Sequence, residues 1–229
     1  MTREHELAAA LSAVQQRVRD ACAAAGRDPR DVTLVAVSKT RPASDVAVLR
    51  DLGLRDFGES RDQEAALKAA EVPGVRWHFV GRLQSNKAAR VVRYVDVVHS
   101  VDRTGLVAAL AGAAARAERR LDVLLQVSLD GDPARAGAPV EQVPALADEV
   151  AAAASLRLAG VMAVPPLDAD PAAAFDVLVA LAARLRDDHP TATGISAGMS
   201  SDLEQAVAAG ATMVRVGTAL FGSRPPVLR

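Results

Sequence analysis

The chain has 229 residues, half of them hydrophobic, with 27 basic and 28 acidic side chains and a net charge of −1. This length fits one large domain or two small ones, and the hydrophobic content excludes a disordered chain or a linker. The balanced charge argues against a nucleic-acid-coating protein or a polybasic membrane binder, and the single cysteine excludes an internal disulfide and a cysteine-based zinc site.

A helix is predicted over residues 3–25, where apolar side chains recur at three- and four-residue spacing from Leu7 to Cys22 and Gly26 follows as a stop. Residues 31–38 then form a short β-rich run with little polar alternation. Such a run is typical of a strand that is covered on both faces, as in a parallel sheet.

The same pattern of a β-rich run followed by a helix repeats along the rest of the chain. The predicted strands cover 31–38, 54–57, 75–80, 95–99, 121–127, 156–162, 193–197 and 211–216. The helices that follow them cover 42–52, 60–70, a segment from about 85, 102–119, 140–153, 171–187 and 201–209.

Eight strands that alternate with helices require crossover connections and therefore a parallel sheet. Eight such units that close on themselves make an α/β TIM-type (β/α)8 barrel. The helix expected after the last strand is weak, because the segment 217–222 is short, so we expect the N-terminal helix, residues 1–26, to pack on the barrel and cover that space. We predict one domain over 1–229. An open doubly wound sheet is the alternative architecture.

A lysine stands at the end of the first predicted strand, on the face where parallel barrels carry their active sites. Lys39 is one of only three lysines in the chain. Burial there would lower the pKa of the amine and leave a neutral, nucleophilic fraction. The alternative is a solvated lysine, or one that pairs with a carboxylate.

Two turns with glycines and hydroxyl groups follow the seventh and eighth predicted strands. The first contains Gly198, Ser200 and Ser201 and opens a helix, and the second contains Gly217 and Thr218. Backbone N–H groups at such turns bind anions, and barrels often hold phosphate at these two loops. The alternative for the first turn is plain helix capping by a serine hydroxyl.

A lysine amine that faces a phosphate site suggests a phosphorylated aldehyde held as a Schiff base, and pyridoxal 5′-phosphate (PLP) is the candidate. Arg215 lies two residues before Gly217 inside an apolar strand, where an arginine needs a partner. The pyridine nitrogen of PLP is a suitable acceptor. An ion pair with Glu59 or Asp202 is the alternative.

At this point the residues match a known family. The chain resembles the PLP homeostasis proteins, single-domain relatives of the alanine racemase barrel. Residues 78–87 carry the pattern His-Phe-x-Gly-x-Leu-Gln-Ser-Asn-Lys and residues 198–202 the pattern Gly-Met-Ser-x-Asp, which are specific in combination. Further matching segments are 36–40, 57–59, 98–102 and 214–222.

The resemblance implies that Lys39 forms the Schiff base and that Arg215 lies beside the pyridine ring. It also implies that Ser200, Ser201, Gly217 and Thr218 surround the phosphate. Two positions depart from the family pattern. Ser60 stands where the family usually has asparagine near the cofactor, so an amide contact is lost or replaced by water. Arg135 stands in a loop where the family tends to carry a lysine, so an accessory covalent site there is not expected.

The resemblance further implies a protein that binds PLP and manages its free pool without an established turnover. A racemase is the alternative, but it needs two bases, and Tyr94, the single tyrosine, is expected away from the active face. A Schiff-base aldolase fits Lys39 loosely but not the family segments. The segment 78–87 suggests partner docking or ordering of the barrel mouth, and His78 and His99 are expected to make local hydrogen bonds.

The expected partners are PLP itself and PLP-dependent apo-enzymes, with no nucleic acid, membrane or metal. We expect a monomer. We expect it in the cytoplasm, because the chain has a single cysteine, its first residues are charged and no run of about 18 apolar residues follows.

Overall fold

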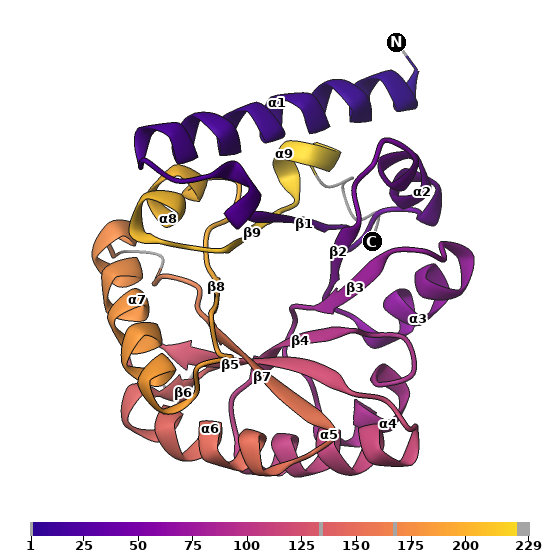
Figure 1. Ribbon diagram of the computed structural model, residues 1–229. Helices are drawn as coiled ribbons and strands as arrows, with labels where there is room; N and C mark the ends of the chain where they lie inside the picture. Colours follow the sequence, from indigo (N-terminus) through magenta and orange to yellow (C-terminus); the bar gives the residue numbers. More distant parts are fainter. Residues whose placement is uncertain (1, 133–134, 167–168, 224–229) are drawn as a thin grey trace.

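The fold is a closed barrel of eight parallel strands, seen along its axis in Figure 1. The computed structural model describes residues 2–132, 135–166 and 169–223. The ring closes through pairing of β4 with β5 and of β1 with β9. In ring order the strands are β1 (Thr33–Val37), β2 (Asp56–Glu59), β3 (Arg76–Phe79), β4 (Val97–Val101), β5 (Leu121–Ser128), β7 (Leu156–Met162), β8 (Gly194–Ser196) and β9 (Met213–Val216). This closure confirms the TIM-type barrel and excludes the open sheet.

A ninth strand lies outside the ring. The two-residue β6 (Ala138–Pro139) pairs with the end of β5, in the loop that leads to the next helix. This strand was not predicted, because two residues carry no periodicity.

Helices surround the ring in the expected order. They are α1 (Arg3–Ala24), α2 (Ala43–Asp51), α3 (Asp62–Glu71), α4 (Ala88–Val91), α5 (Thr104–Arg116), α6 (Val143–Ala152), α7 (Pro171–Asp188), α8 (Leu203–Ala209) and α9 (Thr218–Phe221). Two predicted helices begin instead as 3₁₀ turns, η2 (Ser85–Lys87) before α4 and η3 (Val140–Gln142) before α6. Such turns are frequent where a helix begins, so the two predicted helices start a few residues before the α-helices of the structure.

The N-terminal helix α1 lies along the outside of the ring and packs against α8, α9 and α2 (Figure 1). Its face toward the barrel is apolar and buried from Leu7 to Cys22. The Arg3 guanidinium bonds the Asp45 carboxylate on α2 at 2.6 Å. Helix α1 thus covers the side of the barrel where the last helix, α9, has only four residues.

Alternate residues of each strand point into the barrel or out toward the helices. Inside, Val97, Leu124 and Met162 form a small apolar cluster. Polar side chains also point inward, since His78, His99 and Ser196 hydrogen-bond with one another from three different strands. Among the helices in the described ranges, none has the length and apolar character that a membrane span requires.

Candidate functional site

Lys39 lies in the turn that directly follows β1, at the carboxyl end of the barrel, and is half-buried. In the register of β1 with β9, Ala36 stands opposite Val216, so the next residues, Val37 and Gly217, are also neighbours. A Cβ atom on Gly217 would lie 3.3 Å from the carbonyl oxygen of Val37. The lysine turn and the Gly217 turn therefore adjoin.

The two predicted phosphate turns also contact each other directly. The backbone N–H of Ala219 donates to the Ser200 hydroxyl at 3.3 Å. Gly198 has φ +88°, and a Cβ there would meet the Cβ of Ala206 at 2.5 Å, so this turn requires glycine. The Asp202 carboxylate accepts from the N–H of Met199 at 2.6 Å and fixes the turn from its other side.

Ser200 does not cap α8, which was the alternative interpretation of this segment. Its hydroxyl accepts a hydrogen bond from the other turn, and Asp202 takes the N-cap position without a side-chain cap bond. In the described part of the chain, the N–H groups of Ser200 and Ser201 donate to no protein acceptor. Thr218 is the first residue of α9, so its N–H has no intrahelical acceptor. Three backbone donors are therefore available for an anion.

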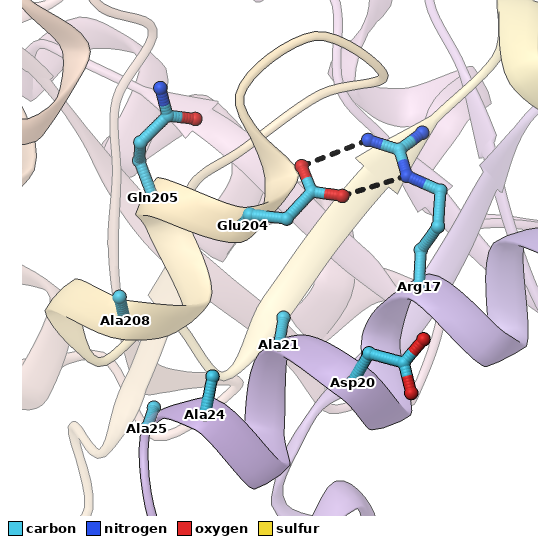
Figure 2. A pocket seen from close by; sticks show the side chains of 8 residues that line it. All are labelled: Arg17, Asp20, Ala21, Ala24, Ala25, Glu204, Gln205 and Ala208. Carbon is cyan, nitrogen blue, oxygen red and sulfur yellow. Dashed lines mark hydrogen bonds and ion pairs between the residues drawn. The ribbon is translucent and has the colours of Figure 1, made fainter.

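The first turn is braced from outside by the N-terminal helix. Arg17 of α1 and Glu204 of α8 line a surface cavity of about 520 Å³. Figure 2 shows the two side chains bonded to each other. The guanidinium makes two bonds to the carboxylate, at 2.8 and 2.9 Å, and a third to the carbonyl oxygen of Ser200 at 3.1 Å. This pairing lowers the pKa of Glu204 through the hydrogen bonds with Arg17. The sequence offered no signal that α1 reaches the turn.

Replacing Arg17 by alanine should weaken binding of a phosphorylated ligand about fivefold, because a net hydrogen bond contributes about 1 kcal/mol. Titration of PLP into the apo protein measures the change. Arg19→Ala is the matched control, since Arg19 lies on the same helix and bonds only Gln16 among the described residues. Equal affinities for the two variants would show that Arg17 does not support the turn.

Arg215 on β9 is a buried cation without an acidic partner in the described residues, with only 5% of its surface exposed. It donates to the Ser196 hydroxyl at 2.6 Å and to the carbonyl oxygen of Ala163 at 2.9 Å. Burial lowers its pKa to about 10, so it stays charged at neutral pH. The alternative interpretation, an ion pair with Glu59 or Asp202, is not found in the described part, because those carboxylates bond elsewhere. A buried cation held only by neutral oxygens favours a ligand acceptor.

An ion-pair network that the sequence analysis missed holds the residue before Lys39. The Lys68 amine on α3 bonds the Ser38 carbonyl oxygen at 2.7 Å and the carboxylates of Glu59 and Glu64, each at 2.6 Å. The Ser38 hydroxyl also donates to Glu59 at 2.6 Å. Lys68 and Glu59 are 4% and 1% exposed. Glu64 and Lys68 stand four residues apart on one helix, which was the available signal.

The same network holds the residue after Lys39. Thr40 has φ +65°, which is unfavourable for a β-branched residue, and its N–H donates to Glu64 at 2.5 Å. Backbone in such a region persists where the surroundings fix it, and it clusters at functional sites. Lys39 therefore projects from a turn that is fixed on both sides.

Ser60 follows β2 at the same end of the barrel. A Cβ on Gly81 would lie 2.5 Å from the Ser60 carbonyl oxygen, so the two loops pack backbone to backbone. Ser60 lines a cavity of about 270 Å³ with Arg82 and Lys87 of the segment 78–87. No hydrogen bond in the described residues joins it to the turns around Lys39, so its contact with a ligand stays a prediction.

Arg135 is held within its own loop region. Its guanidinium pairs with Asp130 at 2.6 Å and donates to the carbonyl oxygens of Val164 and Pro165. Neighbouring residues 133–134 of this loop lie outside the described residues. The arginine connects the loops after β5 and β7.

His78 and His99 are strand residues with hydrogen bonds, as expected, and their partners come from other strands. The two rings bond each other across neighbouring strands at 2.8 Å, because both point into the barrel. Within the described ranges no group of three His, Cys, Asp or Glu side chains could hold a metal ion.

Known proteins resemble this chain over nearly its whole length. The family model "alanine racemase, N-terminal domain" matches residues 10–225. A PLP homeostasis protein of Mycobacterium tuberculosis is 47% identical, over 97% of this chain and 94% of its own. The structure of PipY from Synechococcus elongatus with PLP bound is 36% identical at a TM-score of 0.83, over 94% of this chain and all of that one. An alanine racemase of Streptomyces coelicolor, 22% identical at a TM-score of 0.75 over 95% of this chain and 59% of its own, shares the fold.

Proposed function

The chain belongs to the family of PLP homeostasis proteins, and on that premise we propose that it binds PLP at the carboxyl end of its barrel and helps to manage the free PLP pool. One observation carries the assignment of the site. A half-buried lysine, two adjoining turns with open N–H groups and a buried arginine without an acid partner meet at one end of the barrel.

These residues fit the chemical groups of PLP. The N–H groups and hydroxyls of Ser200, Ser201, Gly217 and Thr218 suit a phosphate, and Arg215 suits the ring nitrogen as a donor. PLP supplies an aldehyde, which would condense with an amine to a Schiff base and release water. Lys39 is the amine that the fixed turn presents for that reaction.

A carrier role fits this site better than catalysis. An arginine that donates to the ring nitrogen leaves it unprotonated, which weakens the ring as an electron sink. Racemisation needs a second base. The Tyr94 hydroxyl donates to the Asp62 carboxylate at 3.0 Å, and burial raises the pKa of the phenol. We further propose that the protein is a cytoplasmic monomer that supplies PLP to apo-enzymes, with a racemase-like activity as the alternative.

Comparison of PLP with pyridoxal, which lacks the phosphate, tests the binding proposal. Equilibrium dialysis with the apo protein should give a dissociation constant at least about tenfold lower for PLP, because pyridoxal leaves the open N–H groups of the two turns unused. Equal affinity for the two compounds would contradict a phosphate site at these turns. Incubation of the loaded protein with alanine should leave its chirality unchanged, whereas rapid racemisation would favour the alternative.

Exchange of Arg215 for glutamate should shift the absorbance of the PLP-loaded protein and weaken binding about tenfold. A carboxylate beside the ring nitrogen favours its protonation, and a buried hydrogen bond to a charged group contributes roughly 1.5–3 kcal/mol. Arg82→Glu is the matched control, because Arg82 is an exposed arginine in the loop after β3 at the same end of the barrel. An unchanged spectrum and affinity in Arg215→Glu would exclude contact with the ring.

A further inference from the structure

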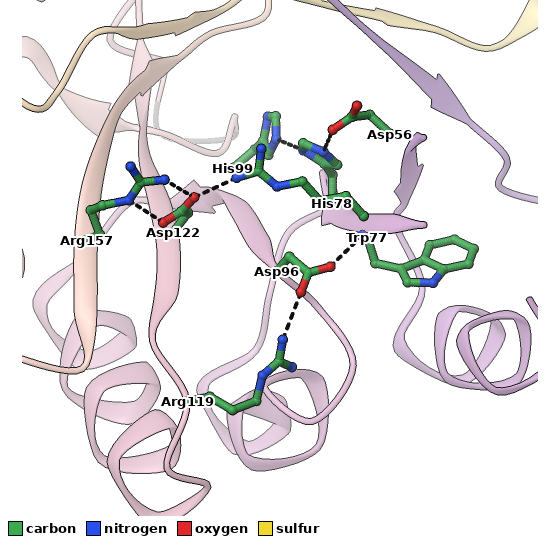
Figure 3. Close-up of polar contacts among 9 residues, drawn as sticks. Asp56, Trp77, His78, Asp96, His99, Arg119, Asp122 and Arg157 are labelled. Atoms are coloured by element: carbon green, nitrogen blue, oxygen red, sulfur yellow. Dashed lines mark hydrogen bonds and ion pairs between the residues drawn. The ribbon is translucent and has the colours of Figure 1, made fainter. Parts of the chain in front are cut away.

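A continuous chain of hydrogen bonds crosses the inside of the barrel and ends at Arg215. The guanidinium donates to the Ser196 hydroxyl at 2.6 Å, and that hydroxyl lies 2.9 Å from Nδ1 of His99. Nε2 of His99 lies 2.8 Å from Nδ1 of His78, and Nε2 of His78 lies 2.9 Å from the Asp56 carboxylate. Figure 3 shows the part of this chain from His99 through His78 to Asp56.

The chain connects the two ends of the barrel. Arg215 stands two residues before Gly217 at the carboxyl end, whereas Asp56 is the first residue of β2 at the opposite end. The interior members Ser196, His99 and His78 are at most 1% exposed. His78 also lines a cavity of about 220 Å³ at the amino end. None of these residues is used by the proposed binding site except Arg215.

The chemistry of the two end groups fixes the direction of every bond between them. An ionised Asp56 only accepts, so Nε2 of His78 donates and Nδ1 of a neutral His78 accepts. Nε2 of His99 then donates to His78, and Nδ1 of His99 accepts from the Ser196 hydroxyl. The Ser196 oxygen accepts the remaining hydrogen bond from Arg215, because a guanidinium only donates. All four bonds therefore run from Arg215 toward Asp56.

The charges around the chain agree with a neutral His99. Burial lowers the pKa of His99 far below its ordinary value, and the positive charges of Arg215 and Arg76 lower it further. Other charged groups at the amino end are Asp31, Asp122 and Arg157, where Asp122 pairs with both Arg76 and Arg157. A proton added at Nδ1 of His78 would reverse the two middle bonds, His78 to His99 and His99 to Ser196, and leave the Ser196 hydroxyl proton without an acceptor in this chain.

We propose that Ser196, His99 and His78 are positioning residues, which form an oriented chain anchored on Asp56 that directs Arg215 toward the bound cofactor. This inference deepens the proposed function and rests on it, because Arg215 is the residue assigned to the ring nitrogen. The amino end of the barrel is thereby coupled to the ligand site at the other end. The environment of Asp56 affects how firmly the guanidinium is held.

The first test is the protonation of both histidine rings in the apo protein. Side-chain ¹⁵N NMR of the full chain with labelled histidine distinguishes the two neutral tautomers. At neutral pH, His78 and His99 should both carry their proton on Nε2, with Nδ1 unprotonated. A proton on Nδ1 of His99, or a protonated His78, would overturn the oriented chain. This measurement needs no variant and no cofactor.

The second test removes the anchor. In Asp56→Ala, Nε2 of His78 loses its fixed acceptor, so the spectrum of His99, which Asp56 does not touch, should show mixed tautomers. The dissociation constant for PLP should rise about threefold. Asp56→Asn keeps an acceptor for His78 and should restore both readouts. Asp31→Ala removes a carboxylate from the same cavity and should change neither.

Unchanged His99 signals and affinity in Asp56→Ala would overturn the proposal. If Asp56→Ala fails to fold, the histidine tautomers of the wild type and the PLP affinity of Asp56→Asn still test the proposal. Failure of the proposed function can be distinguished from failure of the oriented chain. A wild-type protein with the expected tautomers but no affinity for PLP would refute the function alone.

Discussion

Replacing Lys39 by alanine should abolish the visible absorbance of the PLP-loaded protein while leaving weak, phosphate-dependent binding. The absorbance requires a Schiff base, and the chain has only two other lysines. Lys68 is buried in its ion pairs with Glu59 and Glu64. Lys87 lies after β3, in the cavity that Ser60 lines. The turns at Ser200 and Gly217 are unchanged in the variant, so the phosphate still finds its donors.

Spectra of the variant and the wild type with equal PLP, followed by dialysis against phosphate, measure both effects. Lys87→Ala is the control and should keep the full absorbance. Full absorbance in Lys39→Ala would refute the assignment of Lys39. If that absorbance is then lost in a variant that also lacks Lys87, the Schiff base lies on the segment 78–87.

Replacing Lys68 by methionine should destabilise the protein by about 3–5 kcal/mol, the usual cost of removing one partner from a buried ion pair. Glu59 would remain buried beside the Ser38 hydroxyl without its cation. The bond to the Ser38 carbonyl oxygen would also be lost, so the turn that presents Lys39 loosens. Urea unfolding measures the free energy, and PLP titration measures the second effect.

The loss should depend on pH with a definite sign. Burial already raises the pKa of Glu59, and removing the Lys68 amine raises it further. A carboxyl with a higher pKa in the folded state binds more protons when folded, so the stability of the variant rises as pH falls. The deficit against wild type should therefore shrink from pH 8 to pH 5. Lys87→Met is the control and should remain near wild type throughout. A constant deficit would mean that Glu59 does not carry the effect.

The fold followed from the sequence because each strand and helix has its own local pattern. In the helix over 171–187, a proline stands at the first position, and the Asp170 carboxylate caps the helix by accepting from the N–H of Ala172. The carboxyl-end rule for parallel barrels then placed Lys39, the Ser200 turn and the Gly217 turn at one end. Their mutual contacts confirm that placement.

The supports of the site were not predictable in the same way. Lys68, Arg17 and Ser196 act across elements that are far apart in the sequence, and their contacts depend on register and side-chain direction. Periodicity shows which face of a helix is apolar, but not that a lysine on α3 reaches the carbonyl oxygen before Lys39. For the same reason the sequence did not reveal the neutral oxygens that hold Arg215 in the structure, which belong to the Ser196 hydroxyl and the Ala163 carbonyl.

Reduction of the PLP-loaded protein with borohydride, followed by peptide mapping, identifies the lysine that holds the cofactor. Borohydride converts a Schiff base into a stable secondary amine and so marks the lysine that formed it. We expect one pyridoxyl group per chain, attached to Lys39, with loss of the visible absorbance. Label on Lys68 or Lys87, or a colourless protein that takes up no label in excess PLP, would contradict it.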